Sequence, residues 1–498
     1  LTEGMDEPME MTFLPGNRVL FVERKGGVKI LDENTGEVTL VATIPVNTKY
    51  TNKAGVTREA EEGLMGVIAH PDYAKNNWIY MYYADPADAK HVLARWELKG
   101  NELVESSKKI VLEVPTQREE CCHTGGGMVF DAEGNLFLTV GNNTVNPREG
   151  SSNLDERPGM ESSDDQRAPG NTNDLRGKIL RIHPEDDGTY TIPEGNLFPP
   201  GTEKTRPEIY TMGHRNPWRP TLDSKTGYLY WGEVGPDASV DSIWGPKGYD
   251  EFNQAKGPGF FGWPYFIGKN YAYHAHDYET GAKGAAFDPN KPINESRNNT
   301  GLKELPAAQP AFIWYPYADS PEFPQLGNGG RNAEAGPVYY SAMFPKETRY
   351  PDYYDGKLFI YDWIRGWIKA VTMKENGDFD KMEPFMENTR FNSMIDMEVG
   401  PDGKLYLLEY GSGWFSKNPD AGLARIDYNG GNRAPKLTAL RVDKRSGAVP
   451  FKVVATIDAK DPENDELTYS WDLGNGVKKE TNEPRIEYIY EKAGDFDI

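Results

Sequence analysis

The sequence predicts an all-β protein: a β-propeller of about six blades, followed by a small immunoglobulin-like β-sandwich. Glycine (52 residues), proline (37) and aromatic residues (12%) are abundant, as expected for short aromatic strands separated by Gly- and Pro-containing turns. One turn–strand pattern recurs along the chain. A sustained 3.6-residue apolar period is not found, so long helices are not expected.

The recurring pattern is a turn rich in Asp, Gly or Asn, followed by a short alternating strand. Its six copies lie at residues 14–27, 75–85, 131–142, 223–235, 354–366 and 401–413. A lone hairpin cannot bury its faces, so hairpins of this kind stack radially, and each copy is expected to supply an inner hairpin strand of one blade. The alternative is a sandwich of unrelated hairpins, but six similar copies favour the propeller.

A domain boundary is expected in the run NGGNRAPK, between a propeller of residues 1–430 and a second module of residues 434–498. The stretch DPENDELTYSWDLGNG and the ending YEKAGDFDI resemble a PKD domain, an Ig-like sandwich of extracellular proteins, with Trp471 as candidate core tryptophan. The resemblance implies further strands after Phe496. We therefore expect a truncated module and a protein that continues beyond Ile498.

Two long polar intervals interrupt the repeat, at residues 142–174 and from about 277 to 336. Long segments without regular structure are usually functional loops in compact domains. We expect both to lie over one face of the propeller, where ligands bind.

The net charge of −22 argues against nucleic acid as a partner, because a surface that follows phosphates is basic. The acidity fits either solubility or binding of Ca²⁺, which prefers oxygen ligands. No apolar run reaches 18 residues, so no membrane span is expected. The first residues show no signal-peptide pattern, and we expect a leader to have been removed. The PKD-like module favours an extracytoplasmic location: periplasmic, surface-attached or secreted.

The two cysteines are adjacent, at Cys121 and Cys122. This excludes a zinc cluster and a disulfide framework, and the sequence CCH lacks the spacing of a haem attachment site. Two free thiols and a vicinal disulfide remain as alternatives.

Two segments carry candidate catalytic residues. His123 precedes three glycines in CCHTGGGMVF, and glycines let another group approach the backbone closely. Residues 214–216 lie in GHRNPWRP, where Arg215 offers a rigid fork of donors. The alternative for His123 is a structural role in the core, and the alternative for residues 214–216 is a solvated surface loop.

A third segment, residues 232–253, contains candidate calcium ligands. The carbonyls of Gly235 and Pro236 are oxygen ligands of the kind that Ca²⁺ takes, and so are the nearby carboxylates of Asp237, Asp241, Asp250 and Glu251. The spacing is not that of an EF-hand.

Residues from about 5 to 430 resemble the soluble glucose/sorbosone dehydrogenase family, whose members are six-bladed propellers that use pyrroloquinoline quinone. The matching motifs are EEGLMGVIAHPDYAKNNWIYMYY (61–83), HTGGGMVFDAEGNLFLTVGN (123–142), LRGKILRI (175–182), GHRNP (213–217), and EVGPD with YDEFNQAKGPGFFGWP (233–264). The resemblance implies oxidation of a sugar or aldose hydroxyl, with hydride passing to the quinone and an external acceptor taking the electrons.

The resemblance also implies roles for individual residues. His123 aligns with the catalytic base, and Arg215 with the arginine that stabilises negative charge on the quinone oxygens. The other matches are Asn216 as a cofactor contact, Gly235 and Pro236 as carbonyl ligands of the catalytic Ca²⁺, and Asp250 and Glu251 as ligands of a structural Ca²⁺.

The chain departs from the family pattern around the base and the cofactor. Asn142 stands where the family has the acid that orients the base, and Glu61 replaces a glutamine beside the cofactor. Expected cationic positions fall at Ile364, Ser393 and Ile395.

Arg365 and Arg390, close to those positions, are the candidate substitutes in the cofactor clamp, together with Glu61, Arg215, Asn216 and Gly235. Each hydrogen bond to a charged group contributes roughly 1.5–3 kcal/mol, so the departures predict weakened quinone binding.

These departures motivate an alternative function: a propeller that binds or processes carbohydrate without the quinone. Tryptophans stack on sugar rings, and the candidates are Trp218, Trp244, Trp263, Trp363, Trp367 and Trp414. A protein-interaction scaffold is a third alternative, which the His123 and GHRNP segments disfavour.

Overall fold

The computed structural model describes residues 1–144, 152–430 and 435–498. It divides into two compact units, Leu1–Ile426 and Asp427–Ile498. Residues 145–151 of the expected loop 142–174, and residues 431–434 of the expected boundary run, lie outside the described residues.

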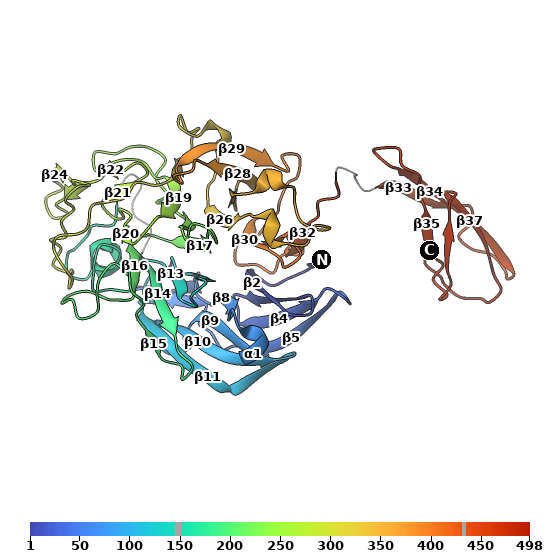
Figure 1. Ribbon diagram of the computed structural model, residues 1–498, viewed down its shortest axis with the longest axis horizontal. Helices are drawn as coiled ribbons and strands as arrows, with labels where there is room; N and C mark the ends of the chain where they lie inside the picture. Colours follow the sequence, from blue (N-terminus) through green and yellow to red (C-terminus); the bar gives the residue numbers. More distant parts are fainter. Residues whose placement is uncertain (145–151, 431–434) are drawn as a thin grey trace. The chain divides into compact units, whose positions relative to one another are not determined.

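Across the described part of the larger unit, six sheets form the blades of a propeller, which confirms the predicted fold class (Figure 1). The first blade contains β2 (Pro8–Leu14), β3 (Arg18–Glu23), β4 (Gly27–Asp32) and β5 (Glu37–Thr43). The second contains β8 (Leu64–Ala69), β9 (Trp78–Ala84), β10 (Lys90–Lys99) and β11 (Glu102–Pro115). The third contains β12 (Gly125–Phe130), β13 (Leu136–Val140), β14 (Lys178–Pro184) and β16 (Ile209–Met212), extended by β15 (Tyr190–Thr191) and β20 (Gly259–Phe260).

The second half of the propeller repeats this arrangement. The fourth blade contains β17 (Pro217–Leu222), β18 (Leu229–Glu233), β19 (Asp250–Ala255) and β25 (Ile313–Tyr315). The fifth contains β26 (Ala333–Val338), β27 (Lys357–Asp362), β28 (Trp367–Met373) and β29 (Phe379–Phe385). The sixth contains β30 (Met394–Val399), β31 (Leu405–Glu409), β32 (Gly422–Ile426) and β1 (Thr2–Glu3). Because β1 pairs with β32, the two ends of the propeller sequence are joined in one sheet.

The first strands of the blades form a closed ring around the axis. Each of β2, β8, β12, β17, β26 and β30 contacts the next, and β30 contacts β2. Each copy of the recurring turn–strand pattern contains the second strand of a different blade, namely β3, β9, β13, β18, β27 and β31. The repeat predicts the blade number because one copy serves each blade.

The remaining elements of the larger unit are short. They are β6 (Lys49–Thr51), β7 (Thr57–Glu59), β21 (Phe266–Ile267), β22 (Tyr271–Ala272), β23 (His274–His276), β24 (Lys283–Ala286), α1 (Tyr73–Asn76) and the 3-10 turns η1 (Glu161–Ser163), η2 (Asp165–Arg167), η3 (Pro324–Leu326), η4 (Ser341–Met343) and η5 (Asp352–Tyr354). Within the residues that the structure describes, no helix is long and apolar enough to cross a membrane.

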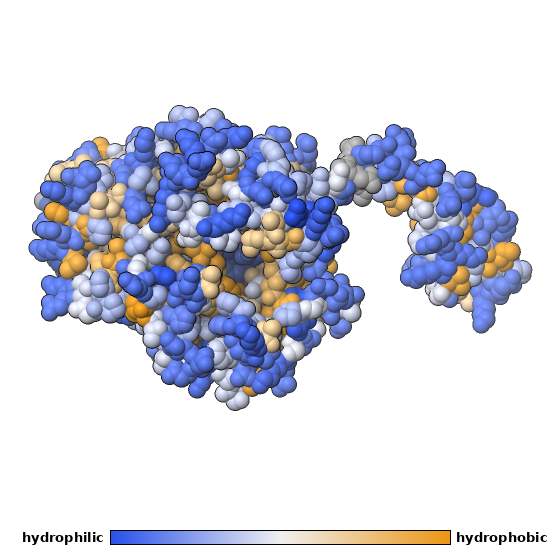
Figure 2. Space-filling model, in the orientation of Figure 1, coloured by the Kyte–Doolittle hydropathy of each residue, from blue (hydrophilic) through white to orange (hydrophobic). Residues whose placement is uncertain are grey.

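The glycines after His123 allow neighbouring blades to approach β12. Gly126 has a φ of 115°, and a Cβ there would lie 2.6 Å from the Cβ of Met65 in β8. A Cβ at Gly127 would lie 2.6 Å from the Cδ of Pro220 in β17. The expected close approach is therefore confirmed, and the approaching groups belong to the second and fourth blades. Figure 2 shows a hollow near the middle of the propeller, bordered by hydrophobic residues.

The smaller unit has two sheets, as expected for an Ig-like module. Strands β33 (Lys436–Val442), β34 (Phe451–Lys460) and β37 (Arg485–Tyr490) form one, and β35 (Tyr469–Asp472) and β36 (Lys478–Thr481) form the other. Trp471 is 3% exposed and packs in a core with Ala455, Leu473 and Ile486, which confirms its predicted core position.

Candidate functional site

A cavity of about 130 Å³ lies where the first strands begin, and side chains from all six blades line it. Four predicted site residues are among them: Glu61, His123, Arg215 and Asn216. The rest of the wall is formed by Met9, Arg24, Met65, Trp218, Val234, Asp237, Asn332, Ile395, Tyr410, Trp414 and Phe415. The ring of first strands therefore brings together residues that lie far apart in the sequence.

His123 is held from both its backbone and its ring. It precedes β12, has a φ of 63°, and is buried. Non-glycine residues adopt this left-handed region infrequently, and such conformations concentrate at functional sites. Its backbone N–H donates to Glu61 Oε2 (2.8 Å), and its ring Nδ1 lies 2.7 Å from Asn142 Oδ1. The imidazole is thus fixed at the cavity wall.

Asn142 connects His123 to an aspartate that the sequence analysis missed. Its Nδ2 donates to both carboxylate oxygens of Asp165, at 2.9 and 3.0 Å. Trp263 Nε1 also donates to this carboxylate (2.6 Å). Burial raises the pKa of Asp165 to about 6, although hydrogen bonds and the charge of Arg215 act in the opposite direction. The sequence feature that could have indicated Asp165 is the acidic pair at residues 164–165, which lies in an interval expected to be a functional loop.

Glu233, also missed, organises the GHRNP segment. Its Oε1 accepts from the backbone N–H groups of Arg215 and Asn216, both at 2.7 Å. Its Oε2 lies 3.1 Å from Nδ1 of His214. Arg215 Nη1 donates to the carbonyl of Val234 (2.8 Å), and burial lowers the pKa of Arg215. Glu233 lies in the EVGPD motif at the end of a strand, and this position is the sequence feature that could have indicated it as a site residue.

Two residues expected to bind calcium contact an arginine instead: Pro236, assigned to the catalytic ion, and Asp250, assigned to the structural ion. The guanidinium of Arg331 donates to the carbonyl of Pro236 and to the carboxylate of Asp250, and it is 4% exposed. The N–H of Gly235 donates to Asp250 Oδ1 (3.0 Å). Among the described residues, no group of three or more His, Cys, Asp or Glu side chains is placed to hold a metal ion.

Glu251, the other expected calcium ligand, is bound by protein donors. Its carboxylate accepts from the N–H of Gly268 and from Asn253 Nδ2. Burial raises the pKa of Glu251 to about 8, and the neighbouring charge of Glu233 acts in the same direction.

The protein is expected to lose stability as the pH rises from 5 to 7. A carboxyl whose pKa is raised in the folded state contributes stability that is complete below the unfolded pKa and is lost as the pH rises through the folded pKa. Burial also raises the pKa of Glu10 to about 8. Each of the two groups is worth roughly 2–2.5 kcal/mol over this interval. Lys178, whose pKa burial lowers to about 7, is mostly protonated in both the folded and the unfolded state below that pH, so it contributes little to this change.

Thermal melts across this pH range provide the measurement. Glu251→Gln is expected to flatten the dependence, whereas Glu102→Gln, at an exposed strand position, leaves it unchanged. An unchanged slope in Glu251→Gln would contradict the assignment.

Arg365 and Arg390 lie outside the lining of the central cavity. Both line another cavity, of about 400 Å³, between the fifth and sixth blades. The guanidinium of Arg365 donates to the carbonyls of Pro316, Leu326, Gly327, Gly329 and Gly330. Arg24 lines the central cavity, where it pairs with Glu7 and Glu59.

The tryptophans divide among several environments. Trp218 and Trp414 line the central cavity, and Trp363 and Trp367 line the cavity beside it. Trp363 and Trp414 meet edge to face, with ring centroids 5.2 Å apart, and Trp414 is 50% exposed. Trp244 stacks on His276.

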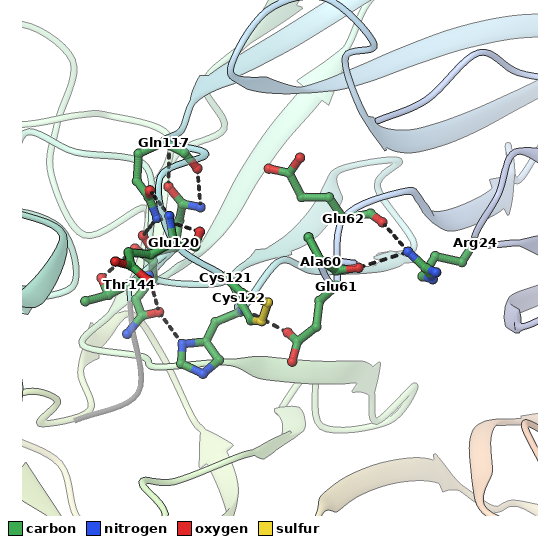
Figure 3. Close-up of a disulfide and its surroundings, with 12 residues drawn as sticks. Arg24, Ala60, Glu61, Glu62, Gln117, Glu120, Cys121, Cys122 and Thr144 are labelled. Atoms are coloured by element: carbon green, nitrogen blue, oxygen red, sulfur yellow. Dashed lines mark hydrogen bonds between the residues drawn. A yellow bond between two sulfur atoms is a disulfide. The ribbon is translucent and has the colours of Figure 1, made fainter. Parts of the chain in front are cut away.

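Cys121 and Cys122 form a vicinal disulfide immediately before His123. Figure 3 shows this disulfide beside the carboxylate of Glu61, with Arg24 beyond Ala60. Of the two alternatives left by the sequence, the structure therefore has the disulfide.

Comparison with known proteins identifies the family. The family described as glucose/sorbosone dehydrogenase matches residues 5–301, and the PKD domain matches residues 444–498. Aldose sugar dehydrogenase YliI of Escherichia coli is 25% identical over 82% of this chain and 88% of its own length. Quinoprotein glucose dehydrogenase B of Acinetobacter calcoaceticus is also 25% identical, over 82% of this chain and 84% of its own.

A solved structure has the same fold. The PQQ-bound aldose sugar dehydrogenase of Streptomyces coelicolor aligns with a TM-score of 0.53 and 18% identity, over 86% of this chain and 95% of that one. Since the family match covers more than half of the sequence, the chain belongs to the glucose/sorbosone dehydrogenase family and carries a PKD domain after its propeller.

Proposed function

We propose that this chain oxidises a hydroxyl group of an aldose sugar, with His123 as the base. The observation that carries the proposal is the fixed imidazole of His123 at the wall of the central cavity, in a chain of this family. The relatives named as aldose sugar and glucose dehydrogenases support the substrate class.

The protein's part in the reaction is to remove a proton and to stabilise charge. The hydroxyl proton passes to Nε2 of His123, while the hydrogen on the same carbon leaves as hydride. Arg215, which lines the same cavity, stabilises negative charge that develops on oxygen during the transfer. Pyrroloquinoline quinone, when bound, supplies the two-electron acceptor for the hydride, and an external acceptor regenerates it.

Part of the cavity wall fits an anionic quinone, although the carboxylates of Glu61 and Asp237 lie in the same wall. Arg24, Arg215, Asn216 and Asn332 supply cationic or amide donors at the wall, and these suit carboxylate and quinone oxygens. The cavity of about 130 Å³ is smaller than the roughly 300–1,000 Å³ of ordinary ligand pockets, so it encloses only part of such a molecule. This agrees with the weakened binding that the sequence predicts.

The residues expected to bind calcium do not fit the ion, because Arg331 already contacts Pro236 and Asp250. No step of the proposed reaction passes through calcium. Arg331 places a permanent positive charge at that position, since a guanidinium stays protonated.

Reconstitution tests the proposal. The purified protein is incubated with pyrroloquinoline quinone, with and without Ca²⁺, and assayed over a panel of aldoses with an artificial electron acceptor. We expect quinone-dependent reduction of the acceptor that does not require Ca²⁺ and is lost in His123→Gln. Absence of both acceptor reduction and retained quinone absorbance after desalting would refute the quinone-dependent reaction.

Binding of carbohydrate without oxidation is the second candidate function. It is favoured by the half-exposed Trp414 at the cavity wall and by Arg365, whose donors are engaged by backbone carbonyls. Sugar rings pack on such aromatic faces. Calorimetry that detects sugar binding in a protein inactive with the quinone would support this candidate.

We further propose an extracytoplasmic location. A vicinal disulfide persists in oxidising compartments, and the PKD domain supports the same assignment. Labelling of free thiols in protein isolated from the native cell tests it: we expect no labelling without prior reduction.

A further inference from the structure

Asp165 is a buried carboxylate that the proposed reaction has not used. It begins the short turn η2 and is fully buried, as is Asn142. Both oxygens of Asp165 accept from Asn142 Nδ2, and the amide oxygen of Asn142 faces Nδ1 of His123 at 2.7 Å. One amide group therefore separates the carboxylate from the imidazole.

The ionisation of Asp165 and the backbone N–H of Thr144, which donates to Asn142 Oδ1 at 3.2 Å, together fix the orientation of this chain of groups. An ionised carboxylate only accepts hydrogen bonds, so the NH₂ end of the Asn142 amide must face it. The amide oxygen, which also only accepts, then faces His123, and Nδ1 must carry the proton. Nε2 is consequently the nitrogen with the lone pair, as a base requires.

We propose that Asp165 is the positioning acid of the site and acts on His123 through the amide of Asn142. This inference rests on the proposed function of His123 as base. Asp165 supplies the negative charge that Asn142 lacks, and it selects the tautomer in which Nε2 accepts a proton. During the reaction the hydroxyl proton passes to Nε2, Nδ1 keeps its own proton, and none moves to Asp165.

Hydrogen-bond donors and cations beside Asp165 oppose the rise in its pKa that burial causes. Trp263 Nε1 and Asn153 Nδ2 donate to Oδ2, at 2.6 and 3.1 Å. Among the described residues, the cations Arg167, Arg176 and Arg215 interact with it, as does Lys178, whose pKa burial lowers to about 7. Although burial raises its pKa to about 6, the carboxylate is predominantly ionised at neutral pH.

A swap of the two side chains tests this proposal. Asp165→Asn is expected to lower kcat on the order of 10²-fold with KM little changed, because the negative charge is lost and the amide orientation is then held mainly by the N–H of Thr144. Asn142→Asp alone is expected to lower kcat as well, since it creates two adjacent carboxylates. The double variant Asn142→Asp with Asp165→Asn places a carboxylate directly on His123 and is expected to recover most of the lost rate.

The tautomer of His123 provides a readout that does not depend on catalysis. In ¹⁵N-histidine-labelled protein, the His123 signal is assigned by its loss in His123→Gln. We expect the Nδ1-protonated form in the wild type and the double variant, and a mixture or the other tautomer in Asp165→Asn. Melting temperatures check that each variant is folded.

An Nε2-protonated His123 in the wild type would overturn the proposal, and so would a folded Asp165→Asn protein that keeps the wild-type tautomer. A double variant no more active than Asp165→Asn would also contradict it, because it would show that Asp165 only holds its own loop. If no sugar is oxidised, the tautomer alone decides, so failure of the proposed function is distinguished from failure of this inference.

Discussion

Replacing His123 with glutamine is expected to lower kcat for sugar oxidation by about 10²- to 10⁴-fold, the usual contribution of a positioned base. Glutamine fills similar space and can still donate to Asn142, but it cannot accept the hydroxyl proton. The backbone N–H that donates to Glu61 is retained, so the fold around β12 should be preserved. Steady-state kinetics of the reconstituted protein measure the effect.

His183→Gln is the matched control for this variant. His183 lies in β14 of the same blade, is partly buried, and its Nδ1 contacts Asn135 at 3.0 Å. It does not line the central cavity. We expect wild-type kcat in His183→Gln, and unaltered quinone binding in both variants. A His123→Gln protein with wild-type turnover would assign the base to another residue.

The fold was predictable because its signals are local. A turn rich in Asp, Gly or Asn followed by an alternating strand is readable within a dozen residues, and one copy occurs in each blade. The resemblance to the family singled out His123, Arg215 and Glu61 as site residues. They lie just before the first strands of three blades, and the ring of first strands brings them to one cavity.

The contacts of Asp165 and Arg331 were not predictable because they join segments that only tertiary packing brings together. Asp165 reaches Asn142 from a loop whose path is decided by tertiary packing, including the indole of Trp263 from a third segment. Arg331 reaches Asp250 across 81 positions. Periodicity and turn chemistry carry no information on such contacts.

Arg365 has the expected residue type, a cation, but its side chain has a different role in the structure. It lies beside the position where the family places a cation, yet its donors are directed at backbone carbonyls of residues 316–330. A guanidinium presents five donors in a planar fork, so neighbouring carbonyls can engage all of it. Proximity in sequence therefore did not predict participation in the central cavity.

Replacing Arg331 with alanine is expected to destabilise the protein by about 3–5 kcal/mol, the usual cost of removing one partner from a buried ion pair. Asp250 is fully buried, and the coulombic interaction with Arg331 opposes the rise that burial causes in its pKa. Without the guanidinium, Asp250 keeps donors from Gly235 and Ala333 but loses its cation. Urea denaturation measures the loss, and Arg58→Ala, at an exposed position of β7, is the control.

Calcium is expected to restore part of this stability in Arg331→Ala and to have no effect on the wild-type protein. Removal of the guanidinium leaves the carbonyl of Pro236 and the carboxylate of Asp250 as oxygen ligands of the kind that Ca²⁺ prefers. An ion that binds only the folded variant stabilises it by RT ln(1 + [Ca²⁺]/Kd), so the midpoint should rise with calcium concentration. Wild-type protein stabilised by Ca²⁺, with the effect abolished by Asp250→Asn, would show that the ion displaces Arg331. Because one pair of oxygens cannot bind both cations, the response of the two proteins decides which cation the native site uses.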